Sequence, residues 1–191
     1  MHDDLETQRL KLRRFTTADV EKLIELDGDP EVMHFVTNGA PTSREEMVQR
    51  VLPAMLPDPS EAGYGFWAVT EKQSGEFIGW FHLIPRAERD PGEPELGYRL
   101  RRHAWGKGYA TEGSRALIDL AFAQLGAREV VAETMAVHTA SRRVMEKAGM
   151  RCVRTFHADW PVSIPGDELG DVEYAITREE WEAQRRTAQP S

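Results

Sequence analysis

The chain has 191 residues, of which 40% are hydrophobic and 29% are charged, a composition typical of one globular α/β domain. The net charge of −8 argues against a broad nucleic-acid-binding surface, and no apolar run approaches the roughly 20 residues that cross a bilayer. The single cysteine excludes an intramolecular disulfide, and the acidic N-terminus lacks a secretory pattern, so cytoplasm is the default location. We therefore expect neither a nucleic-acid nor a membrane partner.

The first third of the chain predicts one strand and two helices. Residues 5–15 contain an alternating stretch that predicts a first strand. Helix starts follow at residues 16–19, with Val20, Leu23 and Ile24 on one face, and at residues 42–46, running toward Leu52. Prolines at positions 53, 57 and 59 should end the second helix and form a loop.

The middle of the chain predicts strands. Residues 65–70 and 77–84 flank a turn at Ser74-Gly75, so we expect a hairpin. The charged stretch 86–94 predicts a surface loop, and residues 95–100 predict another short strand. A run of strands before the first crossover helix favours a mixed sheet over a doubly wound one.

The C-terminal third alternates between predicted helices and predicted strands. Helices are predicted near residues 110–125 and 139–148, and each ends at a glycine. Strands are predicted near residues 129–134, 151–156 and 171–177. We expect residues 1–185 to form a single domain, and the polar residues 186–191 to be a disordered tail.

The most informative segment is a glycine-containing loop between a strand and a helix, residues 103–109, here called the glycine loop. The first amides of a helix have no internal partner and its dipole favours negative charge, so this place suits a phosphate. Gly106 and Gly108 let the backbone turn and approach an anion closely, and Lys107 adds a positive charge.

Two common phosphate motifs fit the glycine loop poorly. An ATP-type P-loop needs glycine six positions before Lys107 and Ser or Thr after it, but Arg101 and Gly108 stand there. The dinucleotide fingerprint needs a third small residue at the position of Thr111 and begins a βαβ fold, whereas several strands precede this loop. A nucleotide-binding enzyme remains a minor alternative.

The run Trp105-Gly106-Lys107-Gly108-Tyr109-Ala110-Thr111-Glu112 resembles the cofactor loop of the GCN5-related N-acetyltransferase (GNAT) superfamily. The pattern of that superfamily is Gln/Arg-x-x-Gly-x-Gly/Ala, and Trp105 stands at its first position. The run is typical of the ribosomal-protein N-terminal acetyltransferases (RimJ/RimL-type). Residues 7–13, 95–98 and 141–150 resemble other segments of that branch, so the likeness spans about residues 7–181.

The resemblance implies a GNAT fold, a mixed α/β (α+β) architecture with a central sheet of about seven strands flanked by about four helices. It implies acetyl-CoA as cofactor and a possible homodimer. The pantetheine arm would pair with the strand around Tyr98, Arg99 and Leu100. The remaining cofactor-binding positions implied are Trp105, Gly106, Lys107, Gly108, Tyr109, Ala110, Thr111, His138 and Ser141. His138 stands where relatives often carry asparagine.

The implied chemistry is direct attack of a primary amine on the thioester, without an acyl-enzyme. Such a reaction needs a group that deprotonates the ammonium and a group that protonates the thiolate. Glu95 is the candidate base, with Glu133 and Glu173 as further candidates, and Ser141 is the candidate proton donor. Glu112 is expected instead to cap the dipole of its own helix with its negative charge.

The acceptor stays open between a protein N-terminus, a small-molecule amine and a lysine side chain. Loops at residues 55–59 and 86–93 are expected to shape its cleft. The histidines show no metal-ligand spacing, so no metal is predicted. The alternative to an enzyme is a non-catalytic acyl-CoA sensor or scaffold on the same fold.

Overall fold

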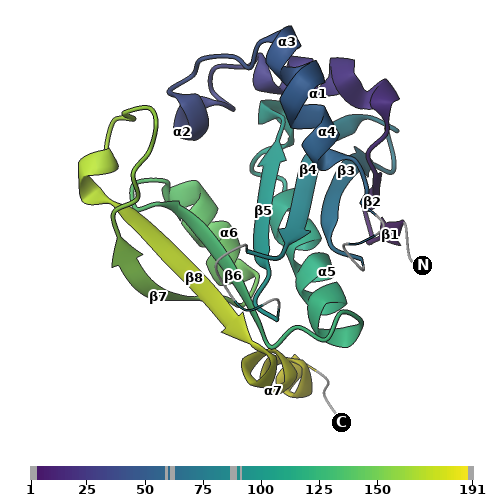
Figure 1. Ribbon diagram of the computed structural model, residues 1–191. Helices are drawn as coiled ribbons and strands as arrows, with labels where there is room; N and C mark the ends of the chain where they lie inside the picture. The colour runs from purple at the N-terminus through teal and green to yellow at the C-terminus, as the bar shows by residue number, and fades with distance from the viewer. Residues whose placement is uncertain (1–3, 59, 61–62, 87–89, 91, 189–191) are drawn as a thin grey trace.

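The computed structural model describes residues 4–58, 60, 63–86, 90 and 92–188 (Figure 1). Their strands form one sheet in the order β1-β2-β3-β4-β5-β6-β8-β7. Within it β5 and β6 run parallel and the other described pairs run antiparallel. The strands are β1 (Leu5–Glu6), β2 (Leu10–Arg14), β3 (Gly65–Glu71), β4 (Phe77–Ile84), β5 (Glu95–Leu100), β6 (Glu129–Met135), β7 (Arg151–Phe156) and β8 (Asp171–Thr177).

Seven α-helical segments accompany this sheet in the described part of the chain. They are α1 (Val20–Asp27), α2 (His34–Thr37), α3 (Arg44–Glu46), α4 (Leu52–Met55), α5 (Tyr109–Ala123), α6 (Thr139–Lys147) and α7 (Arg178–Ala188). A π-helical turn over residues 47–51 joins α3 to α4. Pro53 does not end this stretch; it lies at the start of α4, directly after the π-helical turn.

The mixed α/β fold expected from the sequence is confirmed, with two differences in number. The sheet has eight strands instead of about seven because the chain turns at residues 7–9, where the amide of Thr7 donates to the carbonyl of Leu10 over 2.9 Å. Short one-turn helices, which carry too little periodicity to be recognised, add to the four that were expected.

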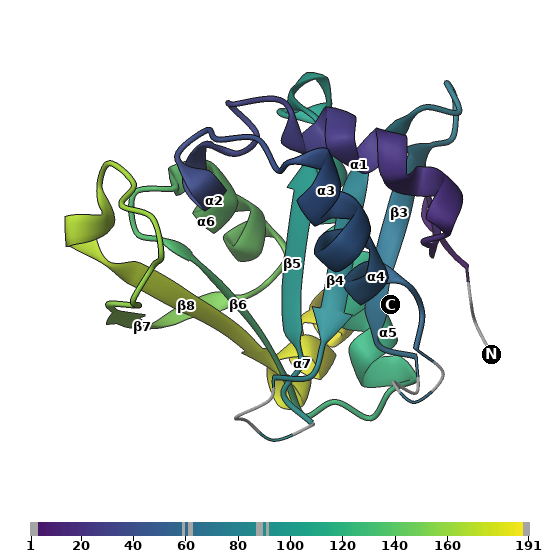
Figure 2. The same ribbon diagram turned by 45° about the horizontal axis from the view of Figure 1, so that its top comes forward.

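The sheet buries a different core on each face. On one face α5 and α6 cover a large core that contains Trp67, Val69 and Phe81. On the other face α1 and the α3–α4 stretch cover a smaller core around Phe15, Leu26 and Ala68 (Figure 2). Alternation along β3 supplies both cores, since successive residues of a strand point to opposite faces.

The C-terminal helix corrects the expectation of a tail beginning at residue 186. Helix α7 continues through Ala188, so residues 186–188 are helical, while residues 189–191 lie outside the described part. Its Trp181 packs against Phe122 of α5 with ring centroids 5.3 Å apart, and its indole N–H donates to Asp119 over 2.6 Å. Trp181 is the aromatic contact of an otherwise polar helix, and Arg178, Gln184 and Arg185 add hydrogen bonds to the rest of the fold.

The two halves of the sheet separate between β5 and β6. The described ladder between these strands consists of one pair, Glu95 with Val131. Beyond that pair the strands diverge, as Figure 1 shows, and α6 begins beside the open end. No helix in the described residues is long and apolar enough to cross a membrane.

Candidate active site

The glycine loop leads from the end of β5 into the N-terminus of α5. Both glycines have positive φ, 73° at Gly106 and 82° at Gly108, a region that favours glycine. Gly108 is the N-cap of α5, and no side chain caps the first amides of this helix. A Cβ at Gly106 would meet no atom within 4 Å, so the loop is open on that side. Uncapped amides beside open space fit a cofactor pyrophosphate.

A salt bridge ties this loop to the N-terminal strands. Arg9 donates through Nε to the Glu112 carboxylate over 2.6 Å and through a terminal nitrogen to the carbonyl of Lys107 over 2.9 Å. The same carboxylate accepts from the hydroxyl of Thr7 over 2.6 Å and from the amide of Arg9 over 2.8 Å. Although burial opposes it, these bonds hold the pKa of Glu112 below its ordinary value. Glu112 therefore binds another part of the chain, beyond the dipole role expected from its position.

Trp105 braces the loop from its other end. Its indole N–H donates to the carbonyl of Leu100 over 2.8 Å, while 45% of the residue stays exposed. The bond fixes the path from β5 into the loop. The guanidinium of Arg9 also lies over the ring of Tyr109 at 4.6 Å. Two aromatic side chains from the predicted cofactor segment thus hold its backbone in place.

Strand β5 presents different side chains on its two faces. Tyr98 points toward the α5–α6 side and packs near Phe81, with ring centroids 5.7 Å apart. Arg99 points the other way, where it pairs with Asp27 of α1 over 2.7 Å and lies 5.1 Å from the Trp80 ring. The side chain of Arg99 therefore secures β5 to α1, and its backbone remains the part available to a cofactor arm.

The hydroxyls of Tyr98 and Ser141 form a hydrogen bond of 3.0 Å between β5 and α6. Tyr98 also donates to the carbonyl of Ser141 over 3.2 Å. Burial raises the pKa of Tyr98 to about 12, so it stays protonated at neutral pH. Ser141 is 8% exposed and lies in the first turn of α6, beside the gap between β5 and β6. The sequence singled out both residues but gave no sign that their hydroxyls meet.

His138 is the N-cap of α6 and stacks on Phe35 of α2, with ring centroids 3.9 Å apart and planes inclined by 16°. Burial lowers the pKa of His138 to about 4, and the neighbouring His34 adds to this effect. His138 is therefore neutral at physiological pH and can give or accept a hydrogen bond there. Asn38, just after α2, also donates to the carbonyl of Ser163 over 3.4 Å. The α2 segment thus lies against both α6 and the loop after β7.

Glu95 begins β5 on the face opposite Tyr98, where an arginine meets it. Arg86 contacts Glu95 over 3.3 Å, Glu133 of β6 over 2.6 Å and Glu173 of β8 over 3.1 Å. The three carboxylates named as candidate bases are therefore neighbours around one guanidinium. Burial raises the pKa of Glu133; Arg86 opposes that rise and the Glu173 carboxylate adds to it. Sequence reasoning placed Arg86 in a loop expected to shape the acceptor cleft but did not single out its side chain, because that loop has no recognisable motif.

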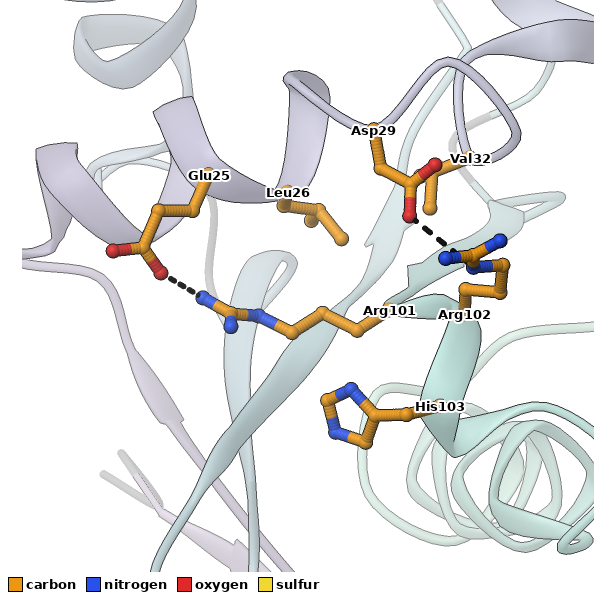
Figure 3. A pocket seen from close by; sticks show the side chains of 7 residues that line it. All are labelled: Glu25, Leu26, Asp29, Val32, Arg101, Arg102 and His103. Atoms are coloured by element: carbon orange, nitrogen blue, oxygen red, sulfur yellow. Dashed lines mark hydrogen bonds and ion pairs between the residues drawn. The ribbon is translucent and has the colours of Figure 1, made fainter.

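A hollow of about 190 Å³ adjoins the beginning of the glycine loop (Figure 3). Arg101 pairs there with Glu25 over 2.6 Å, and Arg102 approaches Asp29 at 3.6 Å. These pairs join α1 to the end of β5 and set the position of the loop. The hollow is lined by Glu25, Leu26, Asp29, Val32, Arg101, Arg102 and His103.

Parts of the two loops expected to shape the acceptor cleft lie outside the described residues, namely position 59 and positions 87–89 and 91. Arg86 belongs to the second loop and is described. Among the described side chains, no group of three or more His, Cys, Asp or Glu residues is placed to hold a metal ion.

Comparison with known proteins gives the family of the chain. Residues 9–151 match the acetyltransferase (GNAT) domain family. The FsC-acetyl coenzyme A-N(2)-transacetylase of Aspergillus fumigatus is 39% identical over 183 residues, 93% of this chain and 77% of that protein. An uncharacterized N-acetyltransferase of Bacillus licheniformis, p20, is 30% identical over 75% of this chain and 79% of its own length.

Solved structures share the fold. A GNAT-family acetyltransferase from Bacillus anthracis superposes with a TM-score of 0.73 at 24% identity, covering 92% of this chain and 99% of its own. The aminoglycoside acetyltransferase AAC(6')-Ib in complex with coenzyme A gives a TM-score of 0.73 at 22% identity, covering 92% and 99%. The chain therefore belongs to the GNAT family of acetyl-CoA-dependent N-acetyltransferases.

Proposed function

We propose that the protein transfers an acetyl group from acetyl-CoA to the primary amine of a small molecule, by direct attack within a ternary complex. The observation that carries this proposal is the arrangement of β5, which has a carboxylate on one face and the Tyr98–Ser141 hydroxyl pair on the other. Glu95 lies where β5 and β6 are still paired, and Tyr98 lies farther along β5, where the two strands have parted and nearer to the glycine loop. A base and a proton donor on opposite sides of one reacting group suit acyl transfer to an amine.

Bound acetyl-CoA supplies an activated acetyl thioester. The amides at the N-terminus of α5 and the glycine loop hold its pyrophosphate in this scheme, and the open edge of β5 near Tyr98, Arg99 and Leu100 holds its arm. His138 contributes a neutral hydrogen-bonding group on the α6 side.

Glu95 removes a proton from the acceptor ammonium in this scheme. Its place at the start of β5, where the two halves of the sheet part, lets an amine approach from the α1 face. Ser141 returns a proton to the leaving sulfur, and Tyr98 supports it through the shared hydrogen bond. An acyl-enzyme is not required, since the amine itself is the nucleophile.

The choice of a small-molecule acceptor rests on the Aspergillus fumigatus relative, which is named for acetyl transfer to N(2) of FsC. A protein N-terminus is the second candidate, because residues 7–13 and 105–112 resemble the RimJ/RimL-type branch. Thr7, Arg9 and Glu112 from these two segments form the bonds that hold the glycine loop, so this resemblance lies in parts that support cofactor binding.

The test is amine-dependent release of coenzyme A from acetyl-CoA with a panel of free amino acids, polyamines, aminoglycosides and peptides of varied N-terminal residue. Calorimetric binding of acetyl-CoA accompanies it. Turnover restricted to small amines supports the proposal, whereas turnover restricted to peptides indicates that the acceptor is a protein N-terminus. Tight cofactor binding without turnover on any amine identifies a sensor, the non-catalytic alternative.

A further inference from the structure

Glu133 and Glu173 face each other directly across the β6–β8 ladder, on the face of the sheet opposite α5. Like charges in directly opposed positions repel each other. Arg86 and Arg154 relieve this repulsion, because both guanidiniums contact both carboxylates, Arg86 at 2.6 and 3.1 Å and Arg154 at 3.6 and 2.9 Å. These four residues, together with Glu95, are called the Arg86 cluster.

Arg86 differs from Arg154 in one respect. Its two terminal nitrogens are engaged by Glu133 and Glu173, which leaves its Nε directed at Glu95 over 3.3 Å. The described contacts of Arg154 are with Glu133, Glu173 and the ring of Phe156. Arg86 alone of the two therefore connects the strand pair β6–β8 to the first residue of β5.

This connection crosses the point where the sheet divides. The described backbone ladder between β5 and β6 is the single pair of Glu95 with Val131. The side chains of Arg86 and Glu95 are 21% and 28% exposed, so their attraction is screened less than that of a fully exposed pair. A cation at this distance favours the ionised form of a carboxylate, which is the form that a general base needs.

We propose that Arg86 is a positioning residue for the acceptor side of the site, which holds Glu95 ionised and aimed into the gap between β5 and β6. The proposal rests on the role given to Glu95 in the proposed function. Arg86 itself keeps its proton throughout, since the pKa of this guanidinium is raised by Glu133 even though burial opposes the rise. The groups that face Glu95 in the described structure are Arg86 and, through it, Glu133, Glu173 and Arg154.

A double-mutant cycle between Arg86→Gln and Glu95→Gln tests this role on the whole chain. We expect Arg86→Gln to lower kcat/KM for the amine by about 10-fold to 100-fold and to move the acidic limb of its pH profile to higher pH. Arg86→Lys should restore part of the activity, and the acetyl-CoA dissociation constant should stay within about twofold in each variant. In the Glu95→Gln background the Arg86→Gln change should cost less than about threefold.

Arg154→Gln is the matched control, because it removes a guanidinium from the same two carboxylates without a described contact to Glu95. We expect it to lower stability but to leave the pH profile in place. The proposal is overturned if Arg154→Gln is as damaging as Arg86→Gln, or if Arg86→Gln costs as much with Glu95 replaced as with Glu95 present. It is also overturned if Glu95→Gln has wild-type activity. The protein would then still transfer acetyl groups, but without Glu95 as the base.

A second readout does not depend on turnover. In protein carrying ¹³C-labelled glutamate, the carboxyl signal of Glu95 is identified by its loss in Glu95→Gln and followed by NMR as the pH is varied. We expect its titration midpoint to rise in Arg86→Gln and to stay in place in Arg154→Gln. An unchanged midpoint in Arg86→Gln contradicts the role of Arg86 even if no amine substrate has been found, so failure here is distinct from failure of the proposed function.

Discussion

Arg9 and Glu112 lie 103 positions apart in the chain, yet their side chains form a salt bridge of 2.6 Å at the mouth of the glycine loop. Arg9 also donates to the carbonyl of Lys107, so one guanidinium restrains both the loop and the first turn of α5. The uncapped amides of α5 can hold a phosphate with little further ordering only if the loop already has its bound shape.

Replacing Arg9 with alanine should therefore weaken acetyl-CoA binding. Charge-assisted hydrogen bonds are worth about 1.5 to 3 kcal/mol, and about 1.4 kcal/mol corresponds to a tenfold change in dissociation constant, so we expect a rise of about tenfold. Calorimetry measures it. Arg44→Ala is the control, because Arg44 forms an arginine–glutamate pair of the same 2.6 Å length with Glu21 on an exposed surface. Equal dissociation constants for Arg9→Ala and Arg44→Ala would show that the Arg9–Glu112 salt bridge does not shape the cofactor site.

The hydroxyl of Ser141 should matter for turnover more than for binding. Loss of a positioned proton donor lowers rates by about 100-fold or more, so Ser141→Ala should reduce kcat by that order with a nearly unchanged KM for acetyl-CoA. Steady-state kinetics with the best amine from the panel measures this. Ser114→Ala serves as control, since Ser114 is a fully buried serine of α5 whose hydroxyl has no described partner. A loss no larger in Ser141→Ala than in Ser114→Ala would refute the donor role.

Tyr98→Phe separates the two hydroxyls of this pair. The phenylalanine keeps the contact with Phe81 but removes the 3.0 Å bond to Ser141. We expect a smaller loss of kcat than in Ser141→Ala, about tenfold, because Tyr98 acts through Ser141. In the Ser141→Ala background the further effect should be slight.

Two partly buried histidines should make stability depend on pH. Burial lowers the pKa of His82 to about 4, and Arg99 adds to this; His138 is lowered to about 4 as well. An unfolded histidine titrates near 6.5, so between pH 6.5 and 4 the unfolded chain binds more protons and the free energy of unfolding falls as the pH is lowered. This contribution is complete above pH 6.5 and lost below pH 4.

Replacing His82 with phenylalanine should flatten that decline. Both ring nitrogens of His82 are buried without a described partner, and its ring stacks on Trp80 with centroids 5.6 Å apart, so an apolar ring suits the place. Urea unfolding at several pH values between 6.5 and 4 measures the slope, whose limit is about 1.4 kcal/mol per pH unit for each group. His157→Phe, at an exposed position, is the control. A slope in His82→Phe equal to that of the wild type contradicts the prediction.

Helix α7 should depend on a single aromatic side chain. Trp181→Ala removes the packing on Phe122 and the hydrogen bond to Asp119, so we expect a loss of about 2 to 4 kcal/mol and a Tm lower by roughly 5 to 10 °C. Thermal unfolding followed by circular dichroism measures it. Glu182→Ala, on the exposed side of the same helix, should change Tm by less than about 2 °C. If Trp181→Ala and Glu182→Ala have the same Tm, the contacts of Trp181 do not stabilise the protein.

Local patterns in the sequence determined the fold class, because strand alternation, helical spacing and cap glycines each act over a few residues. The hairpin of β3 and β4 was predicted within a residue of its observed bounds. The strand–glycine loop–helix order also pointed to the proposed phosphate site, since Gly106 and Gly108 need no distant partner to adopt positive φ.

Only the tertiary structure decided which distant side chains meet. The Tyr98–Ser141 bond and the salt bridges from Glu112 to Arg9 and from Glu95 to Arg86 join segments that no spacing rule relates. Helix α7 was missed for a similar reason. Its sequence is polar and shows no clear apolar face, whereas Trp181 stabilises it through contacts with α5. Such pairings arise from sheet register and helix packing, which depend on the whole chain at once, whereas propensity and periodicity depend on neighbours along it.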